Sequence, residues 1–466
     1  MGFINEIKTH RYRTLKAVCT SLLFAGLGLH SAAYGPSLLD LSIQVNTSID
    51  QITHILPLRA FGNMIGSTIC GFILGYFDHQ IVLIFSMLIM SLSIIFVPLC
   101  ATLWSLYAVM LFNGLGSGVL VNAGNCWVMH KWGKENSPFM QLAHFCFGLG
   151  AFFSPFIIEP FLTEVLDADH TVASSSSNAT IQPSTNTTEI PLIIDPSSLK
   201  LRWGYFILGG LSLIIWALMV ITYLNKRDNK PHPTRDVKVK TSKTDPLVGI
   251  EIVNPDESEE HKSAEKKLRP YHKYIIVLLA ALFIHLVYGL ELSFGVMLAP
   301  YARLSDLHFS KSSASFVSSL YWGCFTFFRL CTLILINFVS PRTVLIIELG
   351  LVMVSNAILL PFLFITSYSG WALWVGSAFM GVGVSSMYPT LWSFVEEIVP
   401  VTSKMNSIVN SCACVGEFIV PVIIGAYIEQ WPNVYICIVF IYSALACLVF
   451  ALCVIWEYII NKHKRS

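Results

Sequence analysis

Long apolar runs alternate with short polar breaks along the whole chain. An apolar helix needs about 20 residues to cross a bilayer, so runs of that length bounded by charged or turn-forming residues indicate membrane spans. Twelve such runs predict an all-α membrane protein with twelve transmembrane helices. The predicted spans are residues 15–37, 54–77, 80–99, 104–130, 138–163, 203–224, 274–298, 312–338, 343–367, 370–396, 404–428 and 432–459.

A polar stretch divides these runs into two groups of six. Residues 225–273 are rich in Lys, Asp, Glu, Ser and Pro and hold too few apolar residues for a core, which is typical of a solvated linker. We therefore predict an N-terminal six-helix half at 1–224, a cytoplasmic linker at 225–273 and a C-terminal six-helix half at 274–466. Because no cleavage site follows the first apolar run, we expect a retained span and not a signal peptide.

The two halves repeat a pattern of small residues at an offset of 266 or 267 positions. Parallel repeats of this kind are typical of one large class of transporters. The repeated glycines themselves are expected to let neighbouring helices pack closely. The matched positions are Gly114, Gly116, Gly150 and Pro155 in the first half and Gly381, Gly383, Gly416 and Pro421 in the second.

Charge and composition set the orientation and narrow the class of function. Most Lys and Arg fall in loops on one side, so the positive-inside rule places both termini in the cytoplasm, with the plasma membrane as the expected location. Three glycosylation sequons, at Asn46, Asn178 and Asn186, then fall in outside loops. A net charge of +1 gives no reason to expect a nucleic-acid partner. We expect a monomer in the lipid bilayer that binds a small-molecule solute.

The sequence shows no pattern of residues that is typical of a catalytic site. The 12 cysteines lack metal-ligand spacing, and no nucleophile with its base and no nucleotide-binding loop is present. An enzyme is therefore not expected, and neither is a metal site or a bound cofactor. A sodium ion or a proton is left open as a co-transported ion.

Amides inside predicted spans are candidates for solute contact. An unpaired polar group in hydrocarbon costs several kcal/mol, so such groups pair within the bundle or line a wet route. Asn122 and Asn125 share a helix face and offer donors and acceptors suited to a polyol, although interhelical bonding is the alternative. Gln141 and His144 also share a face.

Ionisable groups at depth are candidates for solute binding or ion coupling. Glu291 lies near the middle of its span and is a candidate for both roles, the alternative being a structural partner for Arg329. Glu417 and His30 are coupling candidates, although a lone histidine in a helix is more often a satisfied packing residue. Sugar rings stack on aromatic side chains, which adds Trp322, Tyr388 and Trp392 as substrate-binding candidates. The alternative for aromatics is a lipid-facing or interfacial position.

Several motifs resemble the sodium-dependent glucose transporter group of the major facilitator superfamily, of the domain-containing protein 4 type in its fucose-permease-like branch. This resemblance implies the major facilitator fold and hexose transport, with sodium coupling. The chain departs from the group at Val121, where a coupling carboxylate is expected, and in the loop at 75–83, which lacks Lys and Arg. The motifs are "SAAYGPSLLDL", "GNCWVMHKWG", "FMQLAHFCFGLGAFFSP", "YGLELSFGVMLAPYA" and "VGEFIVPVIIG".

The sequence therefore predicts a secondary transporter of a small polyhydroxylated solute, such as glucose, that works by alternating access around a midplane site. Two alternatives stay open. One is a facilitator of another solute such as an organic anion, for which Arg59 and Arg329 are the basic residues at depth. The other is a receptor or scaffold of the same fold that transports nothing.

Overall fold

The computed structural model describes residues 11–132, 136–163, 200–225, 270–335, 338–365, 369–399 and 403–465. Most of the predicted linker and the sequons at Asn178 and Asn186 lie outside these ranges. Within them, all regular structure is helical, in agreement with the predicted class.

Each of the twelve predicted spans corresponds to helix. The first six are α2 (Arg11–Gln44), α4 (Ile55–Ile73), α5 (His79–Phe96), α6 (Leu103–Trp132), α7 (Asn136–Ile158) and α9 (Leu201–Leu224), with a short α3 (Ile49–Thr53) between the first two. The others are α11 (Pro270–Leu304), α12 (Lys311–Leu335), α13 (Pro341–Leu359), α14 (Gly370–Val384), α15 (Met387–Ile398), α16 (Ser403–Tyr427) and α17 (Val434–Arg465).

Eight of the described helices are long and apolar enough to cross a membrane by themselves. The spans outside that set are α4, α12, α14 with α15, and α16. Three of these are the helices that carry Arg59, Arg329 and Glu417. These three helices therefore carry buried charge into the bundle.

The tenth span is wrong as a single helix, because α14 ends before Ser385 and α15 begins after Ser386. The Ser385 hydroxyl donates to the carbonyl of Val382 at 2.8 Å, and its backbone amide bonds the same carbonyl at 3.3 Å. Ser386 leaves the helical region, with φ −126° and ψ 7°. Serine hydroxyls compete with the helical ladder in this way, whereas a hydropathy window registers only length and mean polarity.

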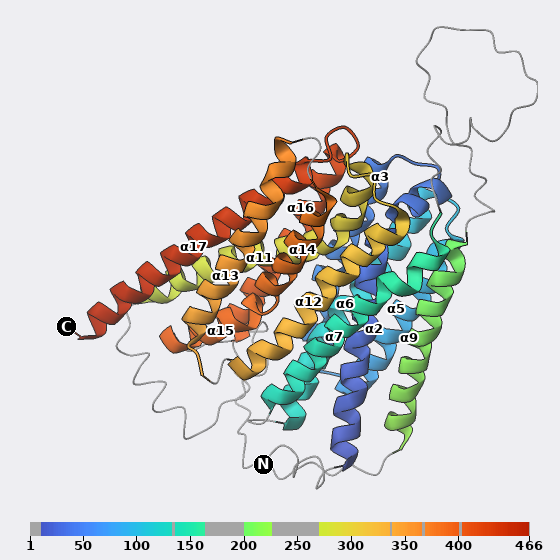
Figure 1. Ribbon diagram of the computed structural model, residues 1–466. Helices are drawn as coiled ribbons and strands as arrows, with labels where there is room; N and C mark the ends of the chain where they lie inside the picture. Colours follow the sequence, from blue (N-terminus) through green and yellow to red (C-terminus); the bar gives the residue numbers. More distant parts are fainter. Residues whose placement is uncertain are drawn as a thin grey trace, which may run out of the picture.

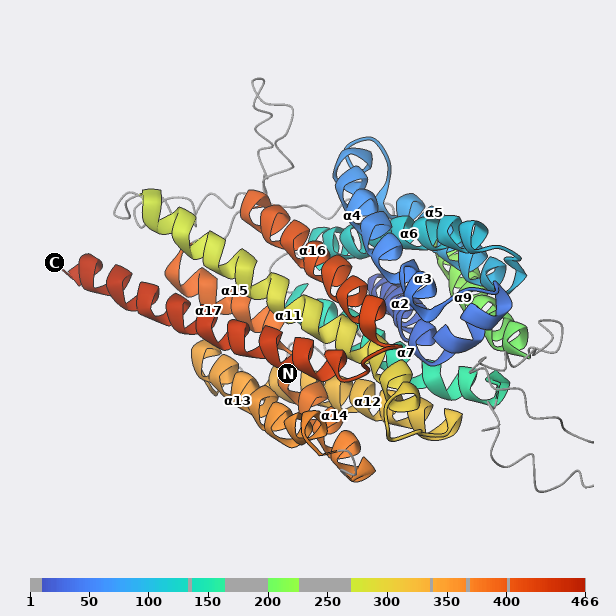
Figure 2. The same cartoon turned by 90° about the horizontal axis from the view of Figure 1, so that it is seen from above.

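The helices gather into two groups that meet along one interface (Figures 1 and 2). One group holds α2 to α9 and the other holds α11 to α17. Contacts across the interface join α2 to α11, α4 and α3 to α16, and α7 to α12. We call the end of the molecule where α2 begins and α17 ends the basal end, and the opposite end the α3 end. At the basal end, helices such as α17 spread away from α2 and α9 (Figure 1).

The repeated glycines bring equivalent helices together in the two groups. A Cβ on Gly150 of α7 would lie 2.0 Å from the backbone oxygen of Ala25 on α2. Its counterpart Gly416 on α16 would place one 2.2 Å from the oxygen of His285 on α11. Both distances are shorter than any real contact, so only glycine allows these helix crossings, as the sequence predicted.

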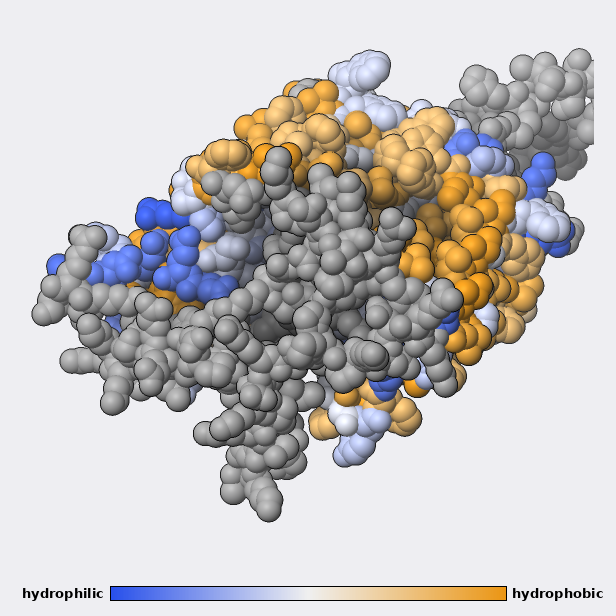
Figure 3. Space-filling view, turned by 90° about the horizontal axis from the view of Figure 1, so that it is seen from below, coloured by the Kyte–Doolittle hydropathy of each residue, from blue (hydrophilic) through white to orange (hydrophobic). Residues whose placement is uncertain are grey.

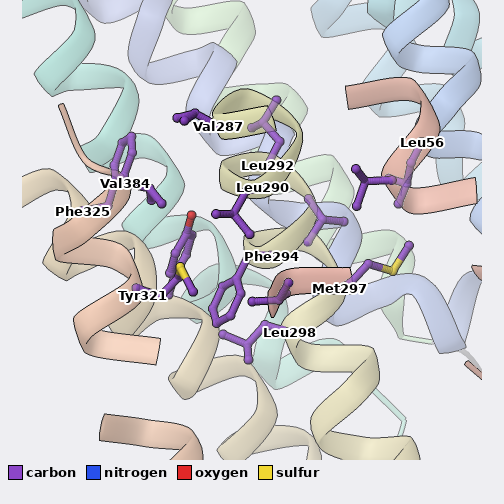
Figure 4. Packing of buried hydrophobic residues seen from close by; sticks show 14 of the residues in the cluster. Leu56, Val287, Leu290, Leu292, Phe294, Met297, Leu298, Tyr321, Phe325 and Val384 are labelled. Atoms are coloured by element: carbon purple, nitrogen blue, oxygen red, sulfur yellow. The ribbon is translucent and has the colours of Figure 1, made fainter. Parts of the chain in front are cut away.

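The core of the second group is built around α11, whose apolar side chains contact α12 and α14 (Figure 4). Tyr321 packs there against Phe294, with ring centroids 5.1 Å apart, and donates its hydroxyl to the backbone oxygen of Glu291 at 2.7 Å. The outer flanks instead expose large apolar side chains such as Phe85, Ile214 and Leu448. Hydrophobic side chains cover much of the flank in the view from the basal end (Figure 3), as contact with lipid requires.

Candidate functional site

A buried ion pair joins the two groups of helices. Arg59 on α4 places its Nη1 3.2 Å from Oε1 of Glu417 on α16, and the two side chains are 9% and 7% exposed. Taking one partner from a buried pair leaves an uncompensated charge, which costs about 3–5 kcal/mol. We call Arg59 and Glu417 the cross-half pair.

Neighbouring polar groups complete the hydrogen bonds of the cross-half pair. Arg59 donates from Nη2 to the Ser31 hydroxyl at 2.8 Å and from Nε to Oδ1 of Asn113 at 3.4 Å. Asn63 donates from Nδ2 to Oε2 of Glu417 at 3.4 Å. The pair, which joins α4 to α16, is thus also anchored by α2 and α6, so its geometry depends on how four helices pack.

His30 extends this network away from the interface. One ring nitrogen, Nε2, lies 2.8 Å from the Ser212 hydroxyl on α9, and the other lies 3.5 Å from the amide nitrogen of Asn113. Because Asn113 also contacts Arg59, His30 reaches the cross-half pair through a single side chain. A coupling role for His30 stays a prediction.

A small cavity lies against the cross-half pair, between the two groups of helices. Arg59 and Glu417 form part of its wall, together with Ser31, Tyr34 and Ser293. The hydroxyls of Tyr34 and Ser293 are buried and make no well-formed hydrogen bond to any described residue. The cavity has room for about one water molecule, which is too little for a hexose.

The interface is held together at the α3 end. Nη1 of Arg303 on α11 lies 3.9 Å from Oδ2 of Asp40 on α2. The backbone amide of Ile49 donates to Oε1 of Glu429 at 2.8 Å. Lys311 donates from Nζ to the carbonyl of Leu162 at 2.9 Å. These bonds close the cavity from the α3 end, whereas the helices diverge toward the basal end (Figure 1).

The predicted amides lie on α6, away from this cavity. Asn122 donates from Nδ2 to the backbone oxygen of Ser67 on α4 at 3.4 Å, which is an interhelical bond of the kind weighed as its alternative. Asn125 keeps a buried Oδ1 without a partner among the described residues. Solute contact by either amide stays a prediction.

Glu291 and Trp322 lie close to the interface. Glu291 is buried on α11, and its carboxylate and the guanidinium of Arg329 are close enough for their charges to interact. The solute-binding and coupling roles of Glu291 stay predictions, with the structural pairing as the alternative. Trp322 is fully buried and meets Phe147 of the other group edge-to-face, with centroids 6.2 Å apart. Its indole N–H donor has no partner among the described residues, and solute contact by Trp322 stays a prediction.

The other candidates are dispersed. The ring of Tyr388 lies 6.4 Å from that of Tyr288, and His144 meets Phe24 edge-to-face at 5.3 Å. Trp392 is half-buried, with its indole N–H unpartnered within the described ranges. The side chain of Gln141 lies outside what the structure describes.

Asn46 is exposed at the α3 end, just after α2, with a positive φ of 50°. An acceptor asparagine has to be accessible, and this position provides that access. Glycosylation at this sequon stays a prediction.

Two cavity residues, Tyr34 and Ser293, had no clear signal in the sequence. Tyr34 and Ser293 carry hydroxyls of a kind that is common in helices, and most of these bond their own backbone. Arg59 is visible as one of two basic residues at depth, but its partner Glu417 is 358 residues away in the chain. Pairing over that separation depends on the docking of the two groups, which no local pattern encodes.

Comparisons with known proteins agree on one type of molecule. The sequence pattern described as "Major Facilitator Superfamily" matches residues 18–400 and 277–466. The protein named sodium-dependent glucose transporter 1 from Homo sapiens is 26% identical over 417 residues, which cover 89% of this chain and 74% of that protein.

Two further likenesses cover nearly the whole chain. Major facilitator superfamily domain-containing protein 4A from Homo sapiens is 25% identical over 463 residues, which cover 91% of this chain and 87% of that protein. The crystal structure of a D-xylose-proton symporter superposes with a TM-score of 0.65 at 12% identity, covering 96% of this chain and 97% of that one.

Proposed function

The chain belongs to the major facilitator superfamily, and from that premise we propose that it carries a small neutral polyhydroxylated solute, a hexose such as glucose, by alternating access of its two six-helix halves. The resemblance found in the motifs is confirmed by relatives in the same group. The proteins it resembles are transporters and not enzymes, in agreement with the expectation from sequence.

The observation that carries the proposal is the composition of the cavity wall. Arg59 and Glu417 neutralise each other, so the wall offers no net charge to a solute. Tyr34 and Ser293 add buried hydroxyls with unused hydrogen-bonding capacity. A neutral wall with free hydroxyls favours a polyol over an ion, because each unmade hydrogen bond there costs about 1–3 kcal/mol until a solute supplies it.

Transport requires the cavity to enlarge. The closed α3 end and the diverging basal end correspond to one arrangement of the two halves, and the opposite arrangement requires the α3-end contact between Arg303 and Asp40 to separate. A solute bound against the cross-half pair touches both halves at once. It can therefore bias their relative position, as alternating access demands.

Ion coupling and membrane placement belong to the same proposal. Names of relatives and neighbours include sodium-dependent and proton-coupled sugar transporters, and Glu417, Glu291 and His30 are our coupling candidates. We place the basal end with both termini in the cytoplasm and the α3 end with Asn46 outside, at the plasma membrane. We take the protein to act as a monomer.

An organic anion is the second candidate, because the guanidinium of Arg59 lies in the cavity wall. An anion could bind there only by displacing Glu417 from Arg59. The substitution Glu417→Gln removes this competitor while keeping the size of the side chain. Anion uptake should rise in that variant if the second candidate is correct, and stay at background if the hexose proposal is correct.

Uptake of labelled glucose into proteoliposomes tests the proposal. Tyr34→Phe and Ser293→Ala each remove one free hydroxyl and should raise KM roughly tenfold, since a solute hydrogen bond in a buried site contributes about 1–2 kcal/mol. Tyr427→Phe is the matched control, because Tyr427 is 55% exposed at the end of α16. Wild-type vesicles that take up no neutral sugar from a panel of hexoses would refute the proposal.

A further inference from the structure

The break between α14 and α15 holds a buried carboxylate that the transport site does not use. Glu348 on α13 is 4% exposed, and its carboxylate faces the backbone amide of Ser386 at the start of α15. Neither carboxylate oxygen makes a well-formed hydrogen bond to a described residue. A carboxylate in this state is costly, because burial without full pairing disfavours its charge.

The surroundings hold Glu348 at the break. A Cβ on Gly383, in the last turn of α14, would lie 2.9 Å from the backbone oxygen of Glu348, so α13 and α14 touch just before the break. On the other side of the break, Arg329 of α12 donates from Nε to the carbonyl of Ser385 at 2.9 Å. A cation therefore binds the Ser385 carbonyl just after α14, while an anion faces the Ser386 amide just before α15, as helix dipoles favour.

One buried guanidinium serves two buried carboxylates here, so the site lacks one positive charge. The guanidinium of Arg329 is the charged group that acts on Glu348 among the described residues, but it is shared with the Ser385 carbonyl, with Glu291 and with the ring of Phe325 4.4 Å away. Thr390, one turn into α15, also keeps a buried hydroxyl oxygen without a described partner. Unpartnered buried oxygens beside a broken helix are the setting in which transporters hold coupling ions.

We propose that Glu348 and the α14–α15 break form a binding site for a monovalent cation, a proton or a sodium ion, and that this cation drives uphill transport. With the cation absent, the charged carboxylate attracts the backbone amide of Ser386 and favours the broken helix. Binding neutralises the carboxylate and weakens that attraction, so α15 is free to move relative to α14. The link to uphill transport rests on the proposed hexose function, whereas cation binding does not.

Thermal unfolding of the purified full-length protein in detergent tests binding without any sugar. The midpoint of the wild type should rise by several degrees when sodium chloride replaces choline chloride, or when the pH is lowered at constant salt. Glu348→Gln should abolish the response and Glu348→Asp should retain part of it. Glu397→Gln, an exposed carboxylate on α15, is the matched control and should respond like wild type.

The salt and pH arms identify the cation. A response to sodium alone assigns a sodium ion, and a response to pH alone assigns a proton. A wild type that responds to neither, or a Glu348→Gln variant that responds as wild type does, overturns the proposal.

Two transport modes then test the coupling. Glu348→Gln should keep sugar counterflow, which needs no driving ion, and lose accumulation against a gradient. Counterflow together with undiminished accumulation in this variant overturns the coupling role. If wild type moves no sugar in either mode while its cation response depends on Glu348, the hexose function fails and the cation site stands.

Discussion

The two halves share their packing and differ in where they place charge. A Cβ on Gly116 would lie 3.1 Å from the backbone oxygen of Ser86, and one on its counterpart Gly383 would lie 2.9 Å from that of Glu348. The first half therefore has a serine at the place where the second half has a buried acid. The Ser86 hydroxyl bonds its own helix, at the carbonyl of Leu83, so this place carries no charge in the first half.

The same contrast appears two residues further along the chain. The repeat offset aligns Ser385 with Gly118, but α6 runs unbroken through Gly118, whereas α14 ends before Ser385. The first half directs its buried arginine, Arg59, across the interface to Glu417, whereas the second half retains Arg329 at its own helix break. The first half thus supplies the cation of the cross-half pair, and the second half holds its own buried arginine at a helix break.

The cross-half pair gives the largest expected effect. Arg59→Met or Glu417→Met alone leaves a buried charge and should lower stability by about 3–5 kcal/mol, while the double variant should recover most of the loss. Thermal unfolding of all three proteins in detergent measures this. Arg342→Met is the control, because its pair with Glu457 at 3.5 Å is 47% exposed on the arginine side and should contribute at most about 1 kcal/mol. A double variant as unstable as the sum of the singles contradicts direct pairing.

The repeated glycines come next and test whether the halves are packed equally. Gly150→Ala and Gly416→Ala each force a methyl group into a backbone oxygen, and both should cost about 1–3 kcal/mol. Gly210→Ala and Gly350→Ala are matched controls, because an added Cβ there meets nothing within 4 Å. The thermal unfolding midpoints of the four variants measure these costs. A large cost at only one of the two repeat positions would show that the packing is not equivalent.

The smallest stability effect is expected where the repeat aligns Asn125 with Trp392. Each keeps a buried polar atom without a described partner, so Asn125→Ala and Trp392→Phe remove no hydrogen bond and should change stability by less than about 1 kcal/mol. Asn122→Ala, which loses its bond to Ser67, should cost about 0.6 kcal/mol. Measuring glucose uptake together with unfolding separates a solute-binding role from a structural one. A loss of uptake at normal stability shows that Asn125 or Trp392 contacts the solute.

Sequence predicted the helices well because bilayer thickness fixes the length of an apolar run. The repeated glycines were equally readable, since close backbone approach requires them. The break at Ser385 was not, because two serines barely alter the mean hydropathy of the span. Arg59 and Glu417 could be named as polar residues at depth, but their pairing across 358 residues depends on how the halves dock. Glu348 was missed although it is an acid inside an apolar span like Glu291, because no neighbouring motif or repeat position drew attention to it.

The central claim is that the halves meet at a site of no net charge that binds a neutral polyol. Thermal stabilisation of the purified wild type by a solute panel tests this most directly, with Tyr34→Phe alongside. We predict that millimolar glucose or a related hexose raises the unfolding midpoint of wild type, that Tyr34→Phe weakens this shift, and that organic anions give none. Stabilisation by organic anions and by no neutral sugar would contradict the account.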